Sequence, residues 1–192
     1  MNKFKEFLET APDFSSLSPD DVDHLEHIMR VSKHPDGYEF FKEGTAGHTV
    51  NLIVEGEVSA THRKGSQRGS IEIKRLRAGE MFGLLSAITD IKHEASCQAV
   101  GPVIIASLPN QAFKLLFGSN STLGLHFQQL VTAQLAKDYS SLVDLLRRAL
   151  FADNEEEIQA VFKHFTGEKY NGAERRASGA ERRAGGSTQP VH

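Results

Sequence analysis

This chain of 192 residues has a single cysteine, Cys97, and a small formal net charge of −3. It also lacks long apolar runs. A single cysteine excludes an internal disulfide framework and suggests a reducing compartment. The small net charge argues against a protein that coats nucleic acid. No apolar run approaches the length that crosses a bilayer, and residues 1–9 lack the apolar core of a secretory signal. We therefore expect a cytoplasmic protein without a membrane span.

The apolar and charged contents, 39% and 24%, are ordinary for a globular chain. We expect one domain over residues 1–150, followed by a short amphipathic helix at 151–166. Further on, the sequence Gly-Ala-Glu-Arg-Arg-Ala occurs twice, at 172–177 and 179–184, with almost no apolar residues around it. This composition predicts that residues 167–192 form a disordered tail rich in glycine and arginine.

Short runs of alternating apolar and polar residues, separated by glycine-containing turns, occupy residues 31–108. Gly56 is expected to end a strand, and residues 50–54 are expected to be buried on one face only. Repeated short strands with glycine turns indicate an antiparallel barrel or jelly roll. The predicted fold class is α+β, an antiparallel, jelly-roll-like β-roll flanked by N-terminal helices and a long C-terminal helix. Strands are predicted at 38–41, 50–55, 58–60, 71–73, 95–100 and 103–108.

One stretch, residues 79–99, carries the clearest functional signal. Gly83 precedes a short apolar run, and a residue without a Cβ lets backbone approach a ligand closely. The amides of Leu84, Leu85 and Ser86 would then begin a helical turn. Free amides at a helix start, with the positive end of the helix dipole, suit an anion such as phosphate.

Three groups of residues carry a resemblance to a known family. Phe82-Gly83 and Ala95-Ser96-Cys97-Gln98-Ala99 form the first group, and Pro35-Asp36-Gly37 with Phe41-x-Glu43-Gly44 form the second. The third is Leu52-Ile53-x-Glu55-Gly56-Glu57-Val58. Together they resemble the phosphate-binding cassette and the β-roll signature of the cyclic nucleotide-binding domain family. That family includes the sensory half of catabolite activator protein and the regulatory subunits of protein kinase A.

The resemblance implies a site for cyclic AMP, cyclic GMP or a cyclic dinucleotide, without a cofactor. The family's glutamate, which holds the ribose 2′-hydroxyl, falls on Leu84, and its arginine, which pairs with the cyclic phosphate, falls on His93. Leu84 cannot accept a hydrogen bond, whereas a protonated His93 would pair with phosphate. Arg75 and Arg77 are candidate substitutes from a neighbouring strand. The implied ligand-binding residues are Phe82, Gly83, Leu84, Leu85, Ser86, His93, Glu94, Ala95, Ser96, Tyr139 and Ser140.

The pattern of residues 121–150 predicts a long helix whose apolar stripe exceeds what a barrel can cover. The helix either lies only on its own domain or also packs against a second copy. The family's equivalent helix dimerises in bacterial members, so a homodimer is expected. A winged helix-turn-helix needs roughly 60–80 residues after this helix, so no direct DNA binding is expected. The implied dimer-interface residues are Phe127, Val131, Leu135, Leu142 and Leu146.

Three functions are compatible with these patterns. The first is a ligand-sensing module that relays a conformational change through the long helix. The second is a dimeric interaction module with a vestigial pocket and an unknown protein partner. The third is a cupin-like metalloenzyme, whose metal needs converging histidines, whereas His34, His48, His62 and His93 are scattered in the sequence. No Ser/His/Asp or Cys/His arrangement is recognisable, so neither catalytic residues nor a metal site are predicted.

Overall fold

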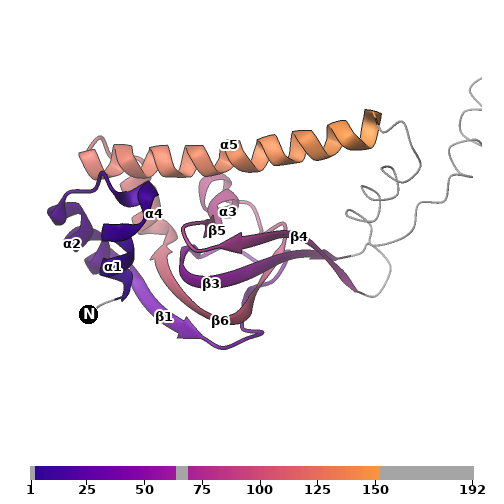
Figure 1. Cartoon of the computed structure of the whole chain (residues 1–192), viewed down its shortest axis with the longest axis horizontal. Helices are drawn as coiled ribbons and strands as arrows, with labels where there is room; N and C mark the ends of the chain where they lie inside the picture. Colours follow the sequence, from indigo (N-terminus) through magenta and orange to yellow (C-terminus); the bar gives the residue numbers. More distant parts are fainter. Residues whose placement is uncertain (1–2, 64–68, 152–192) are drawn as a thin grey trace, which may run out of the picture. The chain divides into compact units, whose positions relative to one another are not determined.

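The computed structural model describes residues 3–63 and 69–151. Two helices precede the sheet, a short helix lies within the chain of strands, and two helices follow it (Figure 1). This order confirms the predicted β-roll with helices at both ends. The helical elements are α1 (Lys3–Thr10), the 3-10 turn η1 (Pro12–Phe14), α2 (Pro19–Ile28), α3 (Leu84–Thr89), α4 (Asn110–Phe117) and α5 (Thr122–Phe151). The strands are β1 (Arg30–His34), β2 (Glu39–Phe41), β3 (Thr49–Arg63), β4 (Ser70–Arg77), β5 (Met81–Phe82) and β6 (Ser96–Pro109).

Strands β3 and β6 form the centre of an antiparallel sheet. The order along the sheet is β1-β6-β3-β4, while β2 pairs with β6 and β5 pairs with β3. The two central strands contain 15 and 14 residues, so each reaches several partners along its length. The short strand β5 pairs with Asn51 and Leu52 of β3. This pairing places Gly83, the residue after β5, against the start of β3.

The sequence predicted that Gly56 ends a strand, but in the structure Gly56 lies within β3. Its φ of 93° is in the left-handed region, and a Cβ there would lie 2.7 Å from the Pro102 carbonyl oxygen. The predicted strands 95–100 and 103–108 are likewise one strand, β6, with Gly101 inside it at a φ of 73°. Glycines of this kind bend a continuous strand at a bulge. Two long bent strands therefore replace four short ones, and their curvature shapes the roll.

Both faces of β3 are buried. Successive side chains of a strand point to opposite sides, so β3 contributes to two separate cores. Val50, Leu52 and Val54 belong to a first core, between the sheet and the helices. Ile53 and Val58 belong to a second core, inside the roll. The sequence predicted burial on one face only. The second face is buried because the sheet closes on itself, which no local pattern records.

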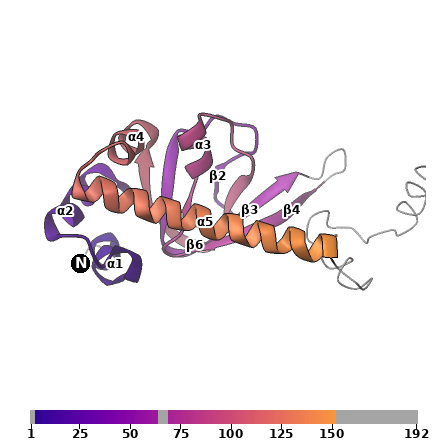
Figure 2. The ribbon, with the colours of Figure 1, turned by 90° about the horizontal axis from the view of Figure 1, so that it is seen from above.

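Helix α5 runs along the side of the roll that carries β4 and β5 (Figures 1 and 2). The chain divides into two compact units, Met1–Asp144 and Leu145–His192, so α5 belongs to the first unit as far as Asp144. The expected helix at 151–166 lies outside the described residues except for Phe151, and the expected tail at 167–192 lies wholly outside them.

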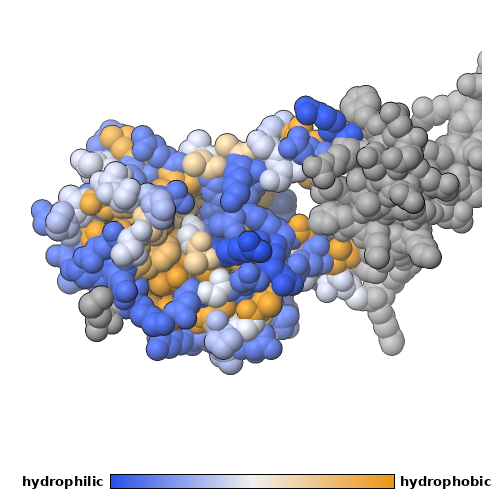
Figure 3. All heavy atoms as spheres, in the orientation of Figure 1, coloured by the Kyte–Doolittle hydropathy of each residue, from blue (hydrophilic) through white to orange (hydrophobic). Residues whose placement is uncertain are grey.

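The outer surface mixes hydrophilic and hydrophobic residues. On the face seen in Figure 3, the hydrophobic residues form separate groups among hydrophilic ones. Among the residues that the structure describes, no helix combines the length and the apolarity that a membrane crossing requires.

Candidate functional site

The predicted cassette is a tight turn between β5 and α3. Gly83 has a φ of 84°, in the left-handed region that favours glycine, and α3 begins at the next residue. A Cβ at Gly83 would lie 2.7 Å from the carbonyl oxygen of Thr49 and 3.7 Å from the ring of Phe41. The close approach that the absent Cβ permits is thus to the chain's own backbone, whereas the sequence analysis related it to a ligand.

The first turn of α3 leaves backbone amides without a helical acceptor. The first backbone bond of the turn joins the Ala87 amide to the Gly83 carbonyl at 3.2 Å. The amides of Leu84, Leu85 and Ser86 therefore have no carbonyl partner within the helix. The Ser86 hydroxyl also donates to the Gly83 carbonyl, at 3.0 Å. The helix thus begins at the residue that the sequence predicted.

Leu84, at the family's glutamate position, is a core residue. Its side chain is 4% exposed and belongs to the first core, together with Met81 and Ala87. Phe82, two residues earlier, belongs instead to the second core, inside the roll. Of Leu84, only the backbone amide is left as a candidate ligand-binding group, because the side chain is enclosed on the helical side of the sheet.

His93, at the family's arginine position, is also buried, with 6% of its surface exposed. Its imidazole stacks on the Phe41 ring, with ring centres 3.6 Å apart and planes 4° from parallel. Its Nδ1 lies 3.2 Å from the Ser86 hydroxyl oxygen. Burial, and secondarily the charge of nearby His48, lower the pKa of His93 below its usual value. The lowered pKa favours the neutral form of the side chain that the sequence proposed as a phosphate partner.

The loop before β3 fixes the position of His93. The His93 amide donates to the Thr45 carbonyl at 2.9 Å, and the His93 carbonyl accepts the Gly44 amide at 2.7 Å. A Cβ at Gly47 would overlap the Ser86 hydroxyl oxygen and lie 3.1 Å from Cε1 of His93. Gly47 is thus a site residue that sequence analysis missed. Its signal was only a glycine in a turn, which does not say what packs on it.

The remaining residues of the motif lie at the start of β6. The Ser96 hydroxyl accepts the amide of Glu43 at 3.0 Å, which joins β6 to the loop after β2. Ala95 is partly buried against the second core. Glu94 is exposed, and its carbonyl lies 3.0 Å from Nδ1 of His62. Ser96 is therefore tied to the loop after β2, whereas the Glu94 side chain is on the surface.

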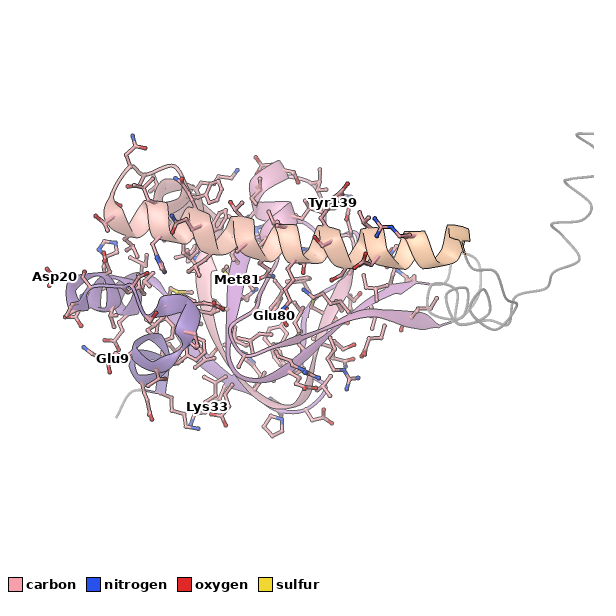
Figure 4. The ribbon with its side chains drawn as sticks, turned by 45° about the horizontal axis from the view of Figure 1, so that its top comes forward. Glu9, Asp20, Lys33, Glu80, Met81 and Tyr139 are labelled. Atoms are coloured by element: carbon pink, nitrogen blue, oxygen red, sulfur yellow. The ribbon has the colours of Figure 1, made fainter. Side chains whose placement is uncertain are left out.

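The two residues that the sequence proposed on the long helix are exposed. Tyr139 is 69% exposed and projects from the edge of α5 away from Glu80 and Met81 (Figure 4), and Ser140 is also exposed. Gln134 of α5 contacts the strand that leads into the cassette, because its side chain bonds to the Met81 backbone. Sequence analysis missed Gln134. A glutamine beside an apolar stripe resembles any residue at the edge of a buried helix face.

An ionic network joins α5 to the turn before β5. Glu80 accepts the Arg77 amide at 2.8 Å and lies 3.4 Å from Lys74 and 3.5 Å from Lys137. Lys74 also pairs with Asp138 of α5. Burial alone would raise the pKa of the Glu80 carboxyl, but the Arg77 hydrogen bond and the two lysine charges lower it below its usual value.

Two of the five predicted dimer residues are enclosed within their own protomer. Phe127 is 4% exposed and Val131 is fully buried, both in the first core. They are not available to a second copy in this conformation, because the first core already encloses them. Leu135 is partly buried against the same core, and Leu142 is 47% exposed. The side chain of Leu146 lies outside the described part of the chain.

Arg75 and Arg77, which the sequence offered as substitutes for the family's arginine, are paired with carboxylates of the chain itself. Arg75 bonds to Glu72 at 2.8 Å, and Arg77 lies 3.3 Å from Glu57, so both guanidinium groups are paired with carboxylates of β4 and β3. Over residues 3–63 and 69–151, no three histidine, cysteine or acidic side chains come together as a metal site would require.

Comparison with known proteins agrees with this geometry. The model of a family described as the cyclic nucleotide-binding domain matches residues 32–120. The cAMP-dependent protein kinase regulatory subunit of Colletotrichum orbiculare is 30% identical over 115 residues, which are 60% of this chain and 28% of that protein. The chain thus spans little more than a quarter of that relative.

Solved structures show the same fold. The regulatory domain of Toxoplasma gondii PKA, crystallised with cAMP, gives a TM-score of 0.56 and 25% identity, covering 72% of this chain and 49% of that one. A cyclic nucleotide-binding domain from Methylobacillus flagellatus gives a TM-score of 0.59 and 26% identity, covering 74% of this chain and 82% of that one. Residues 32–120 thus resemble the cyclic nucleotide-binding domain in sequence and in fold.

Proposed function

We propose that this chain is a regulatory module that binds a cyclic nucleotide, or a related phosphate-bearing ligand, at the turn after Gly83 and relays occupancy through α5. The observation that carries the proposal is the contact between Gln134 of α5 and Met81, two residues before Gly83. A ligand that moves this turn acts directly on α5. The cAMP in the Toxoplasma co-crystal supports the choice of ligand class. No catalytic step is part of this function.

Binding is expected to be weak compared with a cassette that has both charged residues. Leu84 offers no carboxylate to a ribose hydroxyl, and a neutral His93 offers no charge to a phosphate. Each missing charged hydrogen bond costs about 1.5–3 kcal/mol. The two losses together correspond to an affinity lower by a factor on the order of a hundred to ten thousand.

Calorimetric titration tests this function directly. Cyclic AMP, cyclic GMP and cyclic di-GMP are each titrated into the full chain and into His93→Arg, which provides a permanent charge at the same position. Heat from at least one nucleotide, with tighter binding by the variant, is the expected result. If no nucleotide binds either protein at millimolar concentration, the proposal fails.

A dimeric interaction module with a filled pocket is the second candidate, and one observation favours it. The His93 ring and the Leu84 side chain are both enclosed by the chain itself. A module of this kind needs no ligand and presents its surface to an unknown protein partner. Its distinguishing result is the absence of nucleotide binding by a protein that still self-associates.

Homodimerisation through α5 is part of both candidates. Leu142 is the exposed member of the predicted interface, and Leu125, 49% exposed on the same helix, is a matched control. Sedimentation should show a dimer for the wild type and for Leu125→Asp, and a monomer for Leu142→Asp. A dimer that survives Leu142→Asp would exclude α5 pairing at this position.

A further inference from the structure

His93 has one ring nitrogen that is hydrogen-bonded and one that is not. Its Nδ1 lies 3.2 Å from the Ser86 hydroxyl, while its ring stacks on Phe41. Within the described parts of the chain, its Nε2 forms no hydrogen bond. His93 is 6% exposed, so the nitrogen without a hydrogen-bond partner belongs to a nearly enclosed side chain. An imidazole held in this way is fixed in place but retains a site for one more proton.

Ser86 determines which nitrogen carries the proton of the neutral ring. The hydroxyl has a single hydrogen, which it donates to the Gly83 carbonyl at 3.0 Å. Its oxygen therefore faces Nδ1 with a lone pair, and Nδ1 is assigned as the donor. Nε2 is then unprotonated in the neutral ring. A second proton can be added only at Nε2, where the described chain offers no acceptor for it.

We infer that His93 is the anion ligand of this cassette and that its Nε2 takes up a proton from solvent as a phosphate-bearing ligand binds. This inference rests on the proposed function. The product is an imidazolium whose Nε2–H donates to a phosphate oxygen while Nδ1–H still donates to Ser86. His93 is then neutral when the cassette is empty and positively charged when a ligand occupies it. An arginine at this position would be charged in both states.

The surroundings of His93 oppose its charge until an anion arrives. Glu43 accepts the Arg63 amide at 2.9 Å, and Asp90 pairs with Lys114, so both of these carboxylates are engaged elsewhere. No described carboxylate forms an ion pair with His93. A positive charge on His48 would repel a second positive charge on the His93 ring. The charged or titratable side chains on the segments around His93 are Lys42, Glu43, His48, Asp90, Lys92 and Glu94.

Stacking on Phe41 does not decide the charge of His93. An aromatic face attracts a cation and also packs on a neutral ring. Burial favours the neutral form, because the charged form loses its hydration. An incoming anion reverses this balance by supplying both an opposite charge and an acceptor for Nε2. Ligand affinity must then fall as pH rises, by up to about tenfold per pH unit between the midpoint of His93 in the free protein and its higher midpoint in the complex.

Calorimetry at two pH values tests the inference, with cyclic AMP as the probe. The wild type, His93→Arg and His93→Gln are titrated at about pH 5.5 and about pH 7.5, in buffers of different ionisation enthalpy. The wild type should bind at least tenfold more tightly at the lower pH and take up about one proton. His93→Arg should show no such pH dependence, because its guanidinium is charged at both values. His93→Gln should bind weakly and equally at both.

Nitrogen NMR of the ligand-free wild type provides a second readout. The 15N shifts of His93 should show a proton on Nδ1 in the neutral ring, and Ser86→Ala should remove this preference. Equal wild-type affinity at the two pH values, a pH dependence that survives in His93→Gln, or a neutral ring protonated at Nε2 would each overturn the inference. Absence of binding by all three proteins at both pH values would instead remove the proposed function, and this inference with it.

Discussion

The side-chain amide of Gln134 binds both polar groups of the Met81 backbone. Its Oε1 accepts the Met81 amide at 2.8 Å, and its Nε2 donates to the Met81 carbonyl at 2.6 Å. Met81 and Glu80 lie beneath α5 in Figure 4. The glutamine thus acts as a second hydrogen-bonding partner for β5, which has only two residues and pairs with β3 on its other side. The cassette and α5 are therefore connected through backbone rather than through side-chain packing alone.

Removing this contact should weaken the attachment of α5. Gln134→Ala leaves the partly buried Met81 amide and carbonyl without partners, and two such hydrogen bonds are worth about 1–3 kcal/mol. The free energy of unfolding in urea should fall by that amount. Gln129→Ala, at an exposed position of the same helix, is the control and should change the stability by less than about 0.5 kcal/mol. Equal stabilities of the two variants would show that the Gln134 contact contributes nothing.

Two glycines with similar backbone angles separate strain from steric overlap. A Cβ added at Gly79, φ 92°, would have no atom within 4 Å, whereas a Cβ added at Gly83, φ 84°, would meet the Thr49 carbonyl at 2.7 Å. Gly79→Ala should cost about 1–2 kcal/mol, the penalty of the left-handed conformation. Gly83→Ala should cost about 1–3 kcal/mol more, because the backbone must also move. Thermal unfolding of both variants measures the difference, and equal losses would show that the turn is free to shift.

Glu80 should make the stability depend on acid. Its pKa is lower in the folded state, so its contribution is present above the usual glutamate value of about 4.3 and is lost as pH falls through the lower folded value. Glu80→Gln should therefore be less stable than the wild type at neutral pH, with a difference that shrinks below about pH 4.3. Urea unfolding between neutral and acid pH measures this. A difference that stays constant would refute it, and Glu9→Gln, at an exposed position of α1, is the control.

Restoring the family's glutamate should destabilise the fold. Leu84→Glu places a carboxylate in the first core, which should cost about 2–5 kcal/mol. Leu85→Glu is the matched control, because Leu85 is 43% exposed, and it should change the stability by less than about 0.5 kcal/mol. Cyclic AMP affinity should not rise in Leu84→Glu, since the side chain at this position belongs to the helical side of the sheet. Tighter binding by this variant would mean that residue 84 turns toward the roll.

The motif residues predicted the turn after β5 well, because the requirement is local. The glycine turn at Gly83 and the helix start at Leu84 follow from backbone preferences within a few residues. The same residues predicted the fold family correctly. The roles of the individual site residues in ligand binding are still predictions.

The partners of buried side chains were harder to predict than the backbone conformation, as His93 and Phe127 illustrate. For His93 the sequence predicted contact with a ligand, but it did not predict that the ring is buried against Phe41, which is 52 positions earlier in the chain and belongs to β2. Phe127 was expected to meet a second copy, but it packs in the protomer's own core. An apolar or aromatic residue has the same pattern in the sequence whichever partner covers it. The covering surface is made by segments far apart in the chain.

By itself, the sequence determined the glycine turns, the alternation of the strands and the start of α3, since each depends on the conformational preferences of neighbouring residues. Tertiary structure alone decided that Gly56 bends a strand rather than ending it, that both faces of β3 are buried, and that Gln134 reaches Met81. These outcomes depend on which surfaces meet when the sheet curls and α5 lies along it. Such contacts are set by packing between distant segments, and a linear pattern carries no record of distance in space.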